Sequence, residues 1–458
     1  MVSTSVAAVL LIVGLVIGAG VGYAVVGASG AAKTTTLVST VGGGTVTVTG
    51  GGGGSTVTIT SPGGTVTMTG GSGGNQTYTI GIAFPLTGSL AAFGKSFVQG
   101  VNLAVKQFNA NLTASGSHVQ FKTVVVDDQG TPAGALQAVQ TLYQTDGVHV
   151  IIGPLQTSEV LGARDYADTN HILLLPPASS GTAGAIPNDY ILRPGQPGDL
   201  FESNALAQTV NFFGMKNVVY LYSSDTSEAG TFNLTSSHLI ADGAKVTGIE
   251  VQPQQADYSS AVSTASLDVQ NALSGGGTYA NTAVVLGEHG TDAENMLGHA
   301  ATDQYLSKVR WFGIEALNDQ LLLNSTTVGP FIAKVNLTIT TLYTPGSPQG
   351  TSFLSNFAAV NGAPPEPFTN YAYDVAWIAL LSIVAAGTDN GQSVLNMVPV
   401  IADHFFGSSG TPTWLDVNGD QSLAFFAVDK CVQNGTIYQF NQIGLYNGAS
   451  NTVTFTGK

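Results

Sequence analysis

The stretch YTIGIAFP, at residues 78–85, opens the part of the chain that decides the fold. Its apolar run is typical of a buried strand, and residues 96–108 follow it with apolar side chains at helical spacing. The same order repeats through the predicted strand HVQFKTVVVDD (118–128), a predicted helix at 133–144 and the predicted strand VHVIIGP (148–154). Repeated units of strand and helix predict a parallel sheet with helices on both faces.

A second series of the same kind begins after residues 193–195, once a helix from Ser158 and a strand at 171–177 have completed the first. Its predicted strands lie at 217–223, 244–251, 282–287 and 308–315, and its predicted helices at 198–213, 231–242, 258–273 and 292–302. The chain therefore predicts two α/β domains, one after the other. The apolar run at 375–386, headed by Asp374, is too short to span a membrane and predicts a buried helix.

The N-terminal part has a different character. Val6–Ala28 is a run of about 23 apolar or small residues, enough to cross a membrane as a helix. Cleavage after Ala28 or Ala31 is the alternative, because small residues there fit a signal-peptide site. We expect residues 1–33 to anchor the chain, with everything downstream at the extracellular face of the cell membrane, or to be removed before secretion.

Residues 34–77 repeat one Thr-rich unit between runs of glycine, at 45–49, 56–60 and 65–69. Alternation of Thr with Val, Ile or Met predicts short strands. Each strand is too short to be stable alone, so we expect a flexible stalk, with a small β-layer as the alternative. Six Asn-x-Ser/Thr sequences that could mark a glycoprotein occur at Asn75, Asn111, Asn233, Asn324, Asn336 and Asn434.

Composition excludes several classes of protein. The 458 residues include 28 acidic and 13 basic side chains, and no cluster of Lys and Arg of the kind that nucleic-acid binding needs. A single cysteine, Cys431, excludes a disulfide framework and is expected to pack on a late strand. The G-x-S-x-G match at residues 70–74 lies in the stalk without a strand-to-helix turn, so it does not indicate a hydrolase. We expect no enzyme activity.

The loops after the predicted strands are where a ligand is expected, because open parallel sheets bind at the carboxyl ends of their strands. These loops are rich in Gly, Ser, Thr and Pro, which offer backbone amides and hydroxyls to a small polar ligand. They lie at 85–93, 127–131, 154–158, 176–181, 223–229, 287–292 and 315–318.

Several stretches together resemble one known family, the type I periplasmic-binding fold, and within it the branched-chain amino-acid binding proteins of ABC importers. They are IGIAFPLTGSLAAFGKSFVQGVNLAVKQFN (80–109), VVVDDQGTPAGALQAVQTL (124–142), VHVIIGPLQTSEV (148–160), ILLLPPASS (172–180), YILRPGQP (190–197), WFGIE (311–315) and FTNYAYDVAWIAL (368–380). The resemblance implies two lobes, each with a doubly wound parallel sheet, joined by three crossovers. Lobe 1 comprises residues 78–194 with 344–412, and lobe 2 comprises 195–343 with 413–458.

The resemblance also implies a ligand site. In that family a hydroxyl and backbone amides hold the amino-acid carboxylate, a role that falls here on Thr157 with Ser158 beside it. The loop PPASS implies that the Ala178 carbonyl and Ser180 contact the ligand, and Glu315 takes the place of the acid that pairs with the ammonium group. Helix-end donors for one pole and an ionised acceptor for the other suit a zwitterion.

Three further positions belong to the predicted cleft. Phe93 falls where the family often has an aromatic residue at the cleft mouth. Ser227 replaces an expected tyrosine, and His289 stands at another position that is usually aromatic. Because both departures lie in lobe 2, which closes on the ligand side chain, the sequence favours general amino-acid recognition over leucine-like specificity. No cofactor or metal is implied.

Other interpretations of these acids and histidines stay open at this stage. Asp127 and Asp128 are read as acids that cap the next helix rather than as a catalytic pair. The acids and histidines of GEHGTDAENMLGH match no zinc motif; they are His289, Asp292, Glu294 and His299. Asp416, Asn418 and Asp420 alternate like part of a calcium loop but lack its final Glu, so a turn at Asn418-Gly419 explains them.

The predicted function is capture of an amino acid or similar small polar solute and its delivery to the permease subunits of an ABC importer. A ligand-sensing receptor domain is the first alternative, because the same fold serves that purpose. A structural cell-surface protein that has lost its ligand is the second, and the presence of both Thr157 and Glu315 counts against it.

Overall fold

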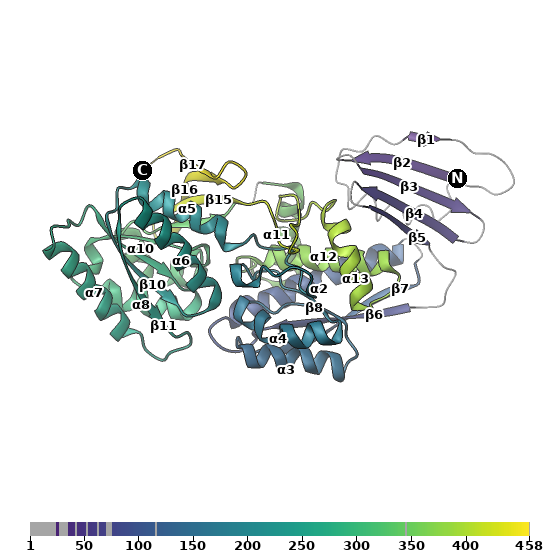
Figure 1. Cartoon of the computed structure of the whole chain (residues 1–458), viewed down its shortest axis with the longest axis horizontal. Coiled ribbons are helices and arrows are strands. Elements are labelled where there is room, and N and C mark those ends of the chain that lie inside the picture. Colours follow the sequence, from purple (N-terminus) through teal and green to yellow (C-terminus); the bar gives the residue numbers. More distant parts are fainter. Residues whose placement is uncertain are drawn as a thin grey trace.

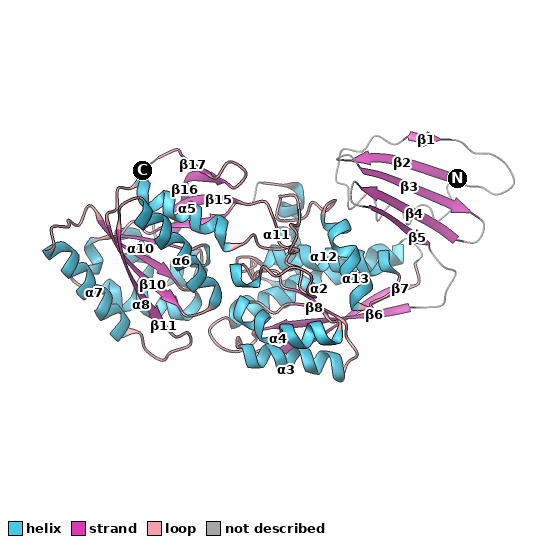
Figure 2. Ribbon diagram, viewed as in Figure 1, coloured by secondary structure: helices cyan, strands magenta, loops and turns pink. Residues whose placement is uncertain are grey.

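The computed structural model describes residues 24–26, 35–41, 44–51, 54–61, 64–69, 76–114, 117–343 and 346–457. From residue 76 onward these residues form two lobes, in each of which helices flank the strands (Figure 1, Figure 2). The predicted parallel pairing is present in the sheet of each lobe, and antiparallel strands extend the sheet of the second lobe.

The first lobe has a four-stranded parallel sheet in the order β7-β6-β8-β9. Its strands are β6 Gln76–Phe84, β7 Val119–Asp127, β8 Val150–Ile152 and β9 Leu173–Leu175. Its helices are α2 Ala91–Ala114, α3 Pro132–Gln144 and α4 Thr157–Asn170, joined from later in the chain by α11 Pro348–Asn361, α12 Thr369–Ala386 and α13 Gly391–Ala402.

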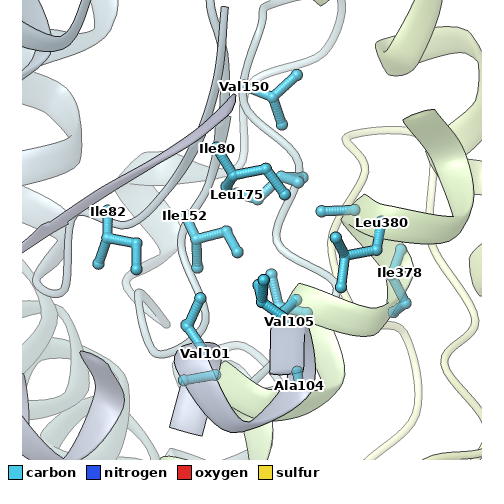
Figure 3. Close-up of a cluster of buried hydrophobic side chains, with 14 of the residues drawn as sticks. Ile80, Ile82, Val101, Ala104, Val105, Val150, Ile152, Leu175, Ile378 and Leu380 are labelled. Atoms are coloured by element: carbon cyan, nitrogen blue, oxygen red, sulfur yellow. The ribbon is translucent and has the colours of Figure 1, made fainter. Parts of the chain in front are cut away.

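Alternation along the strands sorts the apolar side chains of this sheet between two cores. Ile80 and Ile82 of β6, with Val150 and Ile152 of β8, face α2 and α12 (Figure 3). Ile151 lies between Val150 and Ile152 in the strand, so its side chain points to the opposite face of the sheet and packs with α3 and α4. Because both faces are covered, these strands are apolar throughout rather than alternately polar.

The second lobe has an eight-stranded sheet in the order β11-β10-β12-β13-β14-β15-β16-β17. The first five strands pair in parallel, and the last three extend the sheet antiparallel. They are β10 Asn217–Ser223, β11 Lys245–Val251, β12 Thr282–Gly287, β13 Arg310–Gly313, β14 Thr338–Leu342, β15 Phe425–Asn434, β16 Ile437–Asn447 and β17 Thr452–Phe455. Cys431 lies buried in β15, on a late strand as predicted.

Helices cover both faces of the parallel part of this sheet. They are α5 Asp199–Phe212, α6 Thr226–Ala241, α7 Ser259–Ser274, α8 Gly290–Ala301, α9 Gln320–Asn324 and α10 Val328–Lys334, with single turns η1 Thr182–Gly184, η2 Leu306–Lys308 and η3 Glu315–Leu317. The α5 and α6 helices pack on one core, and α7, α8 and α10 pack on the other. The chain passes between the lobes three times, before α5, between β14 and α11, and between α13 and β15.

Several local predictions need correction. The α2 and α6 helices both begin five residues before the predicted starts at 96 and 231. Neither Asp127 nor Asp128 caps α3, because the N-cap is Thr131, whose side chain accepts a hydrogen bond from Gly134 N. The two acids instead hold the neighbouring turns: Asp127 accepts from Leu86 N and Gln129 N, and Asp128 from Gly130 N.

The α12 helix is apolar and long enough to cross a membrane by composition, but 67% of it is buried inside the protein. It packs against α2 in the core of the first lobe. The prediction of a buried helix at 375–386 is confirmed, and the helix begins earlier, at Thr369.

The Thr-rich repeats form a separate antiparallel sheet beside the first lobe, in the order β1-β2-β3-β4-β5 (Figure 1). Its strands are β1 Ala24–Val26, β2 Thr35–Val41, β3 Gly44–Gly51, β4 Gly54–Ser61 and β5 Gly64–Thr69. The three repeats are strands, as predicted, but they pair with one another, so the β-layer replaces the flexible stalk for these residues. Pairing gives each strand the partners that an isolated one lacks. The predicted membrane segment Val6–Ala28 lies outside the described residues, apart from β1.

Candidate functional site

A cavity of about 60 Å³ lies where the two lobes meet. The first lobe contributes Leu90, Phe93, Phe97, Leu155, Gln156, Thr157, Ala178, Ser180 and Phe368. The first crossover and the second lobe contribute Gln196, Asp199, Glu202, Asp225, Ser227, Glu228, Thr231, His289, Ile314, Glu315 and Ala316.

Most of the site residues predicted from the sequence line this cavity. They are Phe93, Thr157, Ala178, Ser180, Ser227, His289 and Glu315. Ser158 is the exception, because its hydroxyl donates a hydrogen bond across to the Asp225 carboxylate in the second lobe. Ser158 therefore joins the lobes to each other.

The apolar wall of the cavity is built by the start of α2 and the residue before α12. Phe93 and Phe368 stack with ring centroids 6.4 Å apart. Gly94 lets the helix approach the preceding loop, since a side chain there would lie 1.8 Å from the Pro85 carbonyl oxygen. The approach places Phe93 against the cavity.

Thr157, at the start of α4, uses its hydroxyl within the first lobe. Its Oγ1 accepts a hydrogen bond from Gly181 N at 2.9 Å and lies 3.0 Å from Ser179 Oγ. Thr157 thus fixes the loop that carries Ala178 and Ser180.

Glu159, two residues further along α4, occupies amides that were expected to face a ligand carboxylate. Its Oε2 accepts from both Leu155 N and Gln156 N at 3.0 Å. Burial, together with the nearby charge of Asp128, raises the pKa of Glu159 well above its usual value. The helix start therefore carries its own buried acid.

Three further acids gather where the first crossover meets η3. Glu202 accepts from Glu315 N and from Thr340 Oγ1, both at 2.7 Å, and Glu315 accepts from the Gln196 side chain. Asp199 accepts from Ser227 Oγ at 2.7 Å. Burial raises the pKa of Asp199 to about 7, and burial with the charge of Glu202 raises the pKa of Glu315 well above its usual value.

Acidic side chains also surround His289, at the start of α8. Its Nε2 lies 3.3 Å from Glu228 Oε1, and its Nδ1 lies 3.5 Å from Glu288 Oε1. Burial opposes the charged ring, but Glu228 and Glu288 outweigh it and raise the pKa of His289 to about 10. Burial raises the pKa of Asp225, the N-cap of α6, to about 7. His289 is therefore a cation held between acids.

Direct contacts bridge the lobes around the cavity. Besides the bond from Ser158 to Asp225, Ser180 Oγ lies 3.1 Å from Ser227 Oγ. The side-chain amide of Gln156 lies 3.1 Å from His289 Nε2. The lobes are thus in contact on both sides of the acids.

The residues weighed as metal ligands do not come together. His299 bonds to Asp257 at 2.8 Å, while Asp292 accepts from Gln254 N. Within the described ranges, no group of three or more His, Cys, Asp or Glu side chains could hold a metal ion. Asp416 accepts from Asn418 N and Asp420 N, which is the predicted turn.

The comparisons with known proteins agree with this architecture. A family model described as periplasmic binding protein matches residues 77–416. An uncharacterized protein of Methanocaldococcus jannaschii is 23% identical over 310 residues, which cover 66% of this chain and 72% of that protein. A Leu/Ile/Val-binding protein homolog of Brucella melitensis is 31% identical over 103 residues, only 22% of this chain and 27% of that protein.

Among solved structures, a leucine-binding protein of Thermotoga maritima superposes with a TM-score of 0.65 at 19% identity. The match covers 81% of this chain and 99% of that protein. At this identity the likeness concerns the fold. The family model begins at residue 77 and so omits the N-terminal part.

Proposed function

The chain belongs to the periplasmic binding protein family, and from that premise we propose that it captures a small polar solute carrying an amino group for an ABC importer. The solute, an amino acid or a related amine, is held between the lobes, and the loaded protein presents it to the permease subunits. The N-terminal segment tethers the protein at the extracellular face of the membrane. The protein performs no chemistry on the solute.

The observation that carries this proposal is the position of Glu315. Its side chain is 5% exposed, lines the cavity between the lobes, and has one oxygen, Oε2, that no N–H or hydroxyl donor reaches. The carboxyl lies against that of Glu202. Burial and the charge of Glu202 raise the pKa of Glu315 and favour its protonated form. An ammonium group supplies both a donor and a positive charge, so it allows the carboxyl to ionise. The aromatic wall of Phe93 and Phe368 suits the apolar part of such a solute.

A thermal-shift screen of the full chain tests the proposal. The ligands are the twenty amino acids, small amines and aromatic acids such as benzoate. Ligand at 100 times its dissociation constant stabilises the native state by about 2.7 kcal/mol, which is a readily measured shift. We expect at least one solute with an amino group to bind. Binding that occurs only with solutes lacking an amino group would contradict the assignment of Glu315.

A further inference from the structure

The cavity holds more acid than one ammonium group needs. Five carboxyl side chains line it: Asp199, Glu202, Asp225, Glu228 and Glu315. His289 is the one base among the lining residues that the structure describes. His289 faces Glu228 and also interacts with the charge of Asp225, so Asp199, Glu202 and Glu315 have no basic side chain beside them in the cavity.

Two of the oxygens in this cavity accept no hydrogen bond from an N–H or hydroxyl donor. They are Oε2 of Glu315 and Oε2 of Glu228, on side chains that are 5% and 7% exposed. The carboxyl groups that carry them lie against other carboxyls, Glu315 against Glu202 and Glu228 against Asp225. Buried polar atoms are nearly always hydrogen-bonded, and a buried charge is usually paired. The two oxygens belong to two different pairs of carboxyls, and each pair calls for a shared proton or a cation between its members.

The surroundings offer little to a negatively charged group. Arg193, the guanidinium near the cleft, is bound to Asp420 and to carbonyl oxygens of the first lobe. The amides of Leu155 and Gln156 are bound to Glu159. A solute that brought one positive and one negative charge would leave the excess of acid unchanged.

We propose that the solute is a small organic cation with two amino groups on a short aliphatic spacer. One ammonium group lies against Asp199, Glu202 and Glu315, and the other lies against Asp225 and Glu228. The spacer lies along Phe93 and Phe368. This inference rests on the proposed function of solute capture and names the class of solute.

Titration calorimetry of the full chain at pH 8 and low salt tests the inference with four ligands: 1,4-diaminobutane, lysine, butylamine and leucine. We expect 1,4-diaminobutane to bind at least about tenfold more tightly than butylamine or leucine. Lysine carries the same two amino groups with a carboxylate. If lysine matches the diamine, the two-ammonium solute is a basic amino acid, and if it is weaker, the solute is a simple diamine.

Variants of the acids provide a second readout. Glu315→Gln and Asp225→Asn each remove one charge from one of the two groups, and each should lower the preference for diamine over monoamine by about tenfold or more. Glu250→Gln, on the exposed face of β11, removes the same charge elsewhere and should leave that preference unchanged. Thermal unfolding of each ligand-free variant shows whether it folds, and the wild-type ligand series stands independently of any variant that does not.

The outcomes separate this inference from the proposed function. Equal or tighter binding of leucine or butylamine overturns the two-ammonium solute and leaves solute capture standing. A folded Glu315→Gln variant with an unchanged preference for the diamine also overturns it. A chain that binds none of these ligands and nothing in the wider screen overturns both.

Discussion

Arg193 and Asp420 join the first and third crossovers by a two-pronged ion pair, Nε to Oδ1 and Nη2 to Oδ2, each at 2.6 Å. The arginine side chain is 3% exposed. Its Nη1 also donates to the carbonyl oxygens of Ser179 and Gly181, at 3.1 Å and 2.8 Å. The same guanidinium therefore fixes two connections between the lobes and the loop that carries Ala178 and Ser180.

Asp420→Asn should destabilise the protein strongly, because it leaves the Arg193 charge buried without compensation. Removal of one partner of a buried ion pair typically costs about 3–5 kcal/mol. Urea unfolding measures the change. His299→Gln is the control, because the His299 and Asp257 side chains are 41% and 59% exposed and solvent screens their interaction, so the loss of stability should be far smaller. Similar losses of stability in the two variants would show that the Arg193–Asp420 ion pair stabilises the protein no more than an exposed ion pair does.

The ligand-free protein should become less stable as the pH rises from about 5 to 8. Burial raises the pKa of Asp199 and of Asp225 to about 7, far above the value of about 3.9 expected in the unfolded chain. A raised pKa contributes stability that is complete below the unfolded value and is lost as the pH passes the folded value. The raised pKa of His289 acts in the same direction at higher pH.

Melting temperatures across this range measure that slope. Asp199→Asn should flatten it, whereas Asp146→Asn, at an exposed turn, should keep it. A melting temperature that rises with pH in the wild-type chain would contradict the burial of these acids.

Thr157→Ala should cost about 1–3 kcal/mol of folding stability, because Gly181 N loses its acceptor in a buried place. Thr157→Ser keeps the hydroxyl and should recover most of the loss. Urea unfolding of the pair separates the hydrogen bond from the packing of the methyl group. If the serine variant is as unstable as the alanine variant, the methyl group and not the hydroxyl matters. Solute affinity should fall with the alanine variant as well, because the loop with Ser180 loosens.

Small-angle scattering should show that bound solute compacts the molecule. The lobes are joined by three crossovers, and ionised carboxyls that face one another in an unfilled cleft repel. A saturating cation removes that repulsion and favours the closed arrangement. The measurement compares the radius of gyration with and without 1,4-diaminobutane and with sodium chloride at equal ionic strength. No change at saturation would exclude a hinge.

A chain that begins at Asn75 should fold and bind solute as the full chain does. The two lobes have their own buried cores, in which the described clusters begin at Tyr78. Calorimetry on both chains is the test. Loss of binding in a folded short chain would assign the N-terminal sheet a part in the site.

Much of the fold could be predicted because its strands are covered on both faces. Such strands read as uninterrupted apolar runs. The strands β8, β10 and β12 lie within predicted ranges, and β6 begins at Gln76, two residues before its predicted start. The first turns of α2 and α6 were missed because they lack apolar periodicity. The α6 helix starts early because Asp225 caps it, and α2 starts early because Gly94 permits close approach to Pro85.

The acid-rich character of the site was not predicted, for a physical reason. Asp199 with Glu202, and Asp225 with Glu228, lie at or next to the first turn of a helix, three residues apart. Acidic side chains in the first turn of a helix are stabilised by the helix dipole and are ordinarily solvated. Their convergence depends on how one lobe lies on the other, which no local pattern encodes. The available signal was the pair Asp225 and Glu228, which lies in the loop 223–229 already expected to bind ligand.

The hydrogen bond between Ser158 and Asp225 stabilises the contact between the lobes without any help from a solute. This hydrogen bond favours the closed arrangement whatever the cavity holds. Under the proposed function, the facing carboxyls oppose that arrangement when they are ionised and no cation lies between them. The relative position of the two lobes would then depend on the net charge of the cavity. If the proposed function holds, a permease that contacts only the outer surfaces of both lobes would distinguish the loaded protein from the empty one without touching the solute.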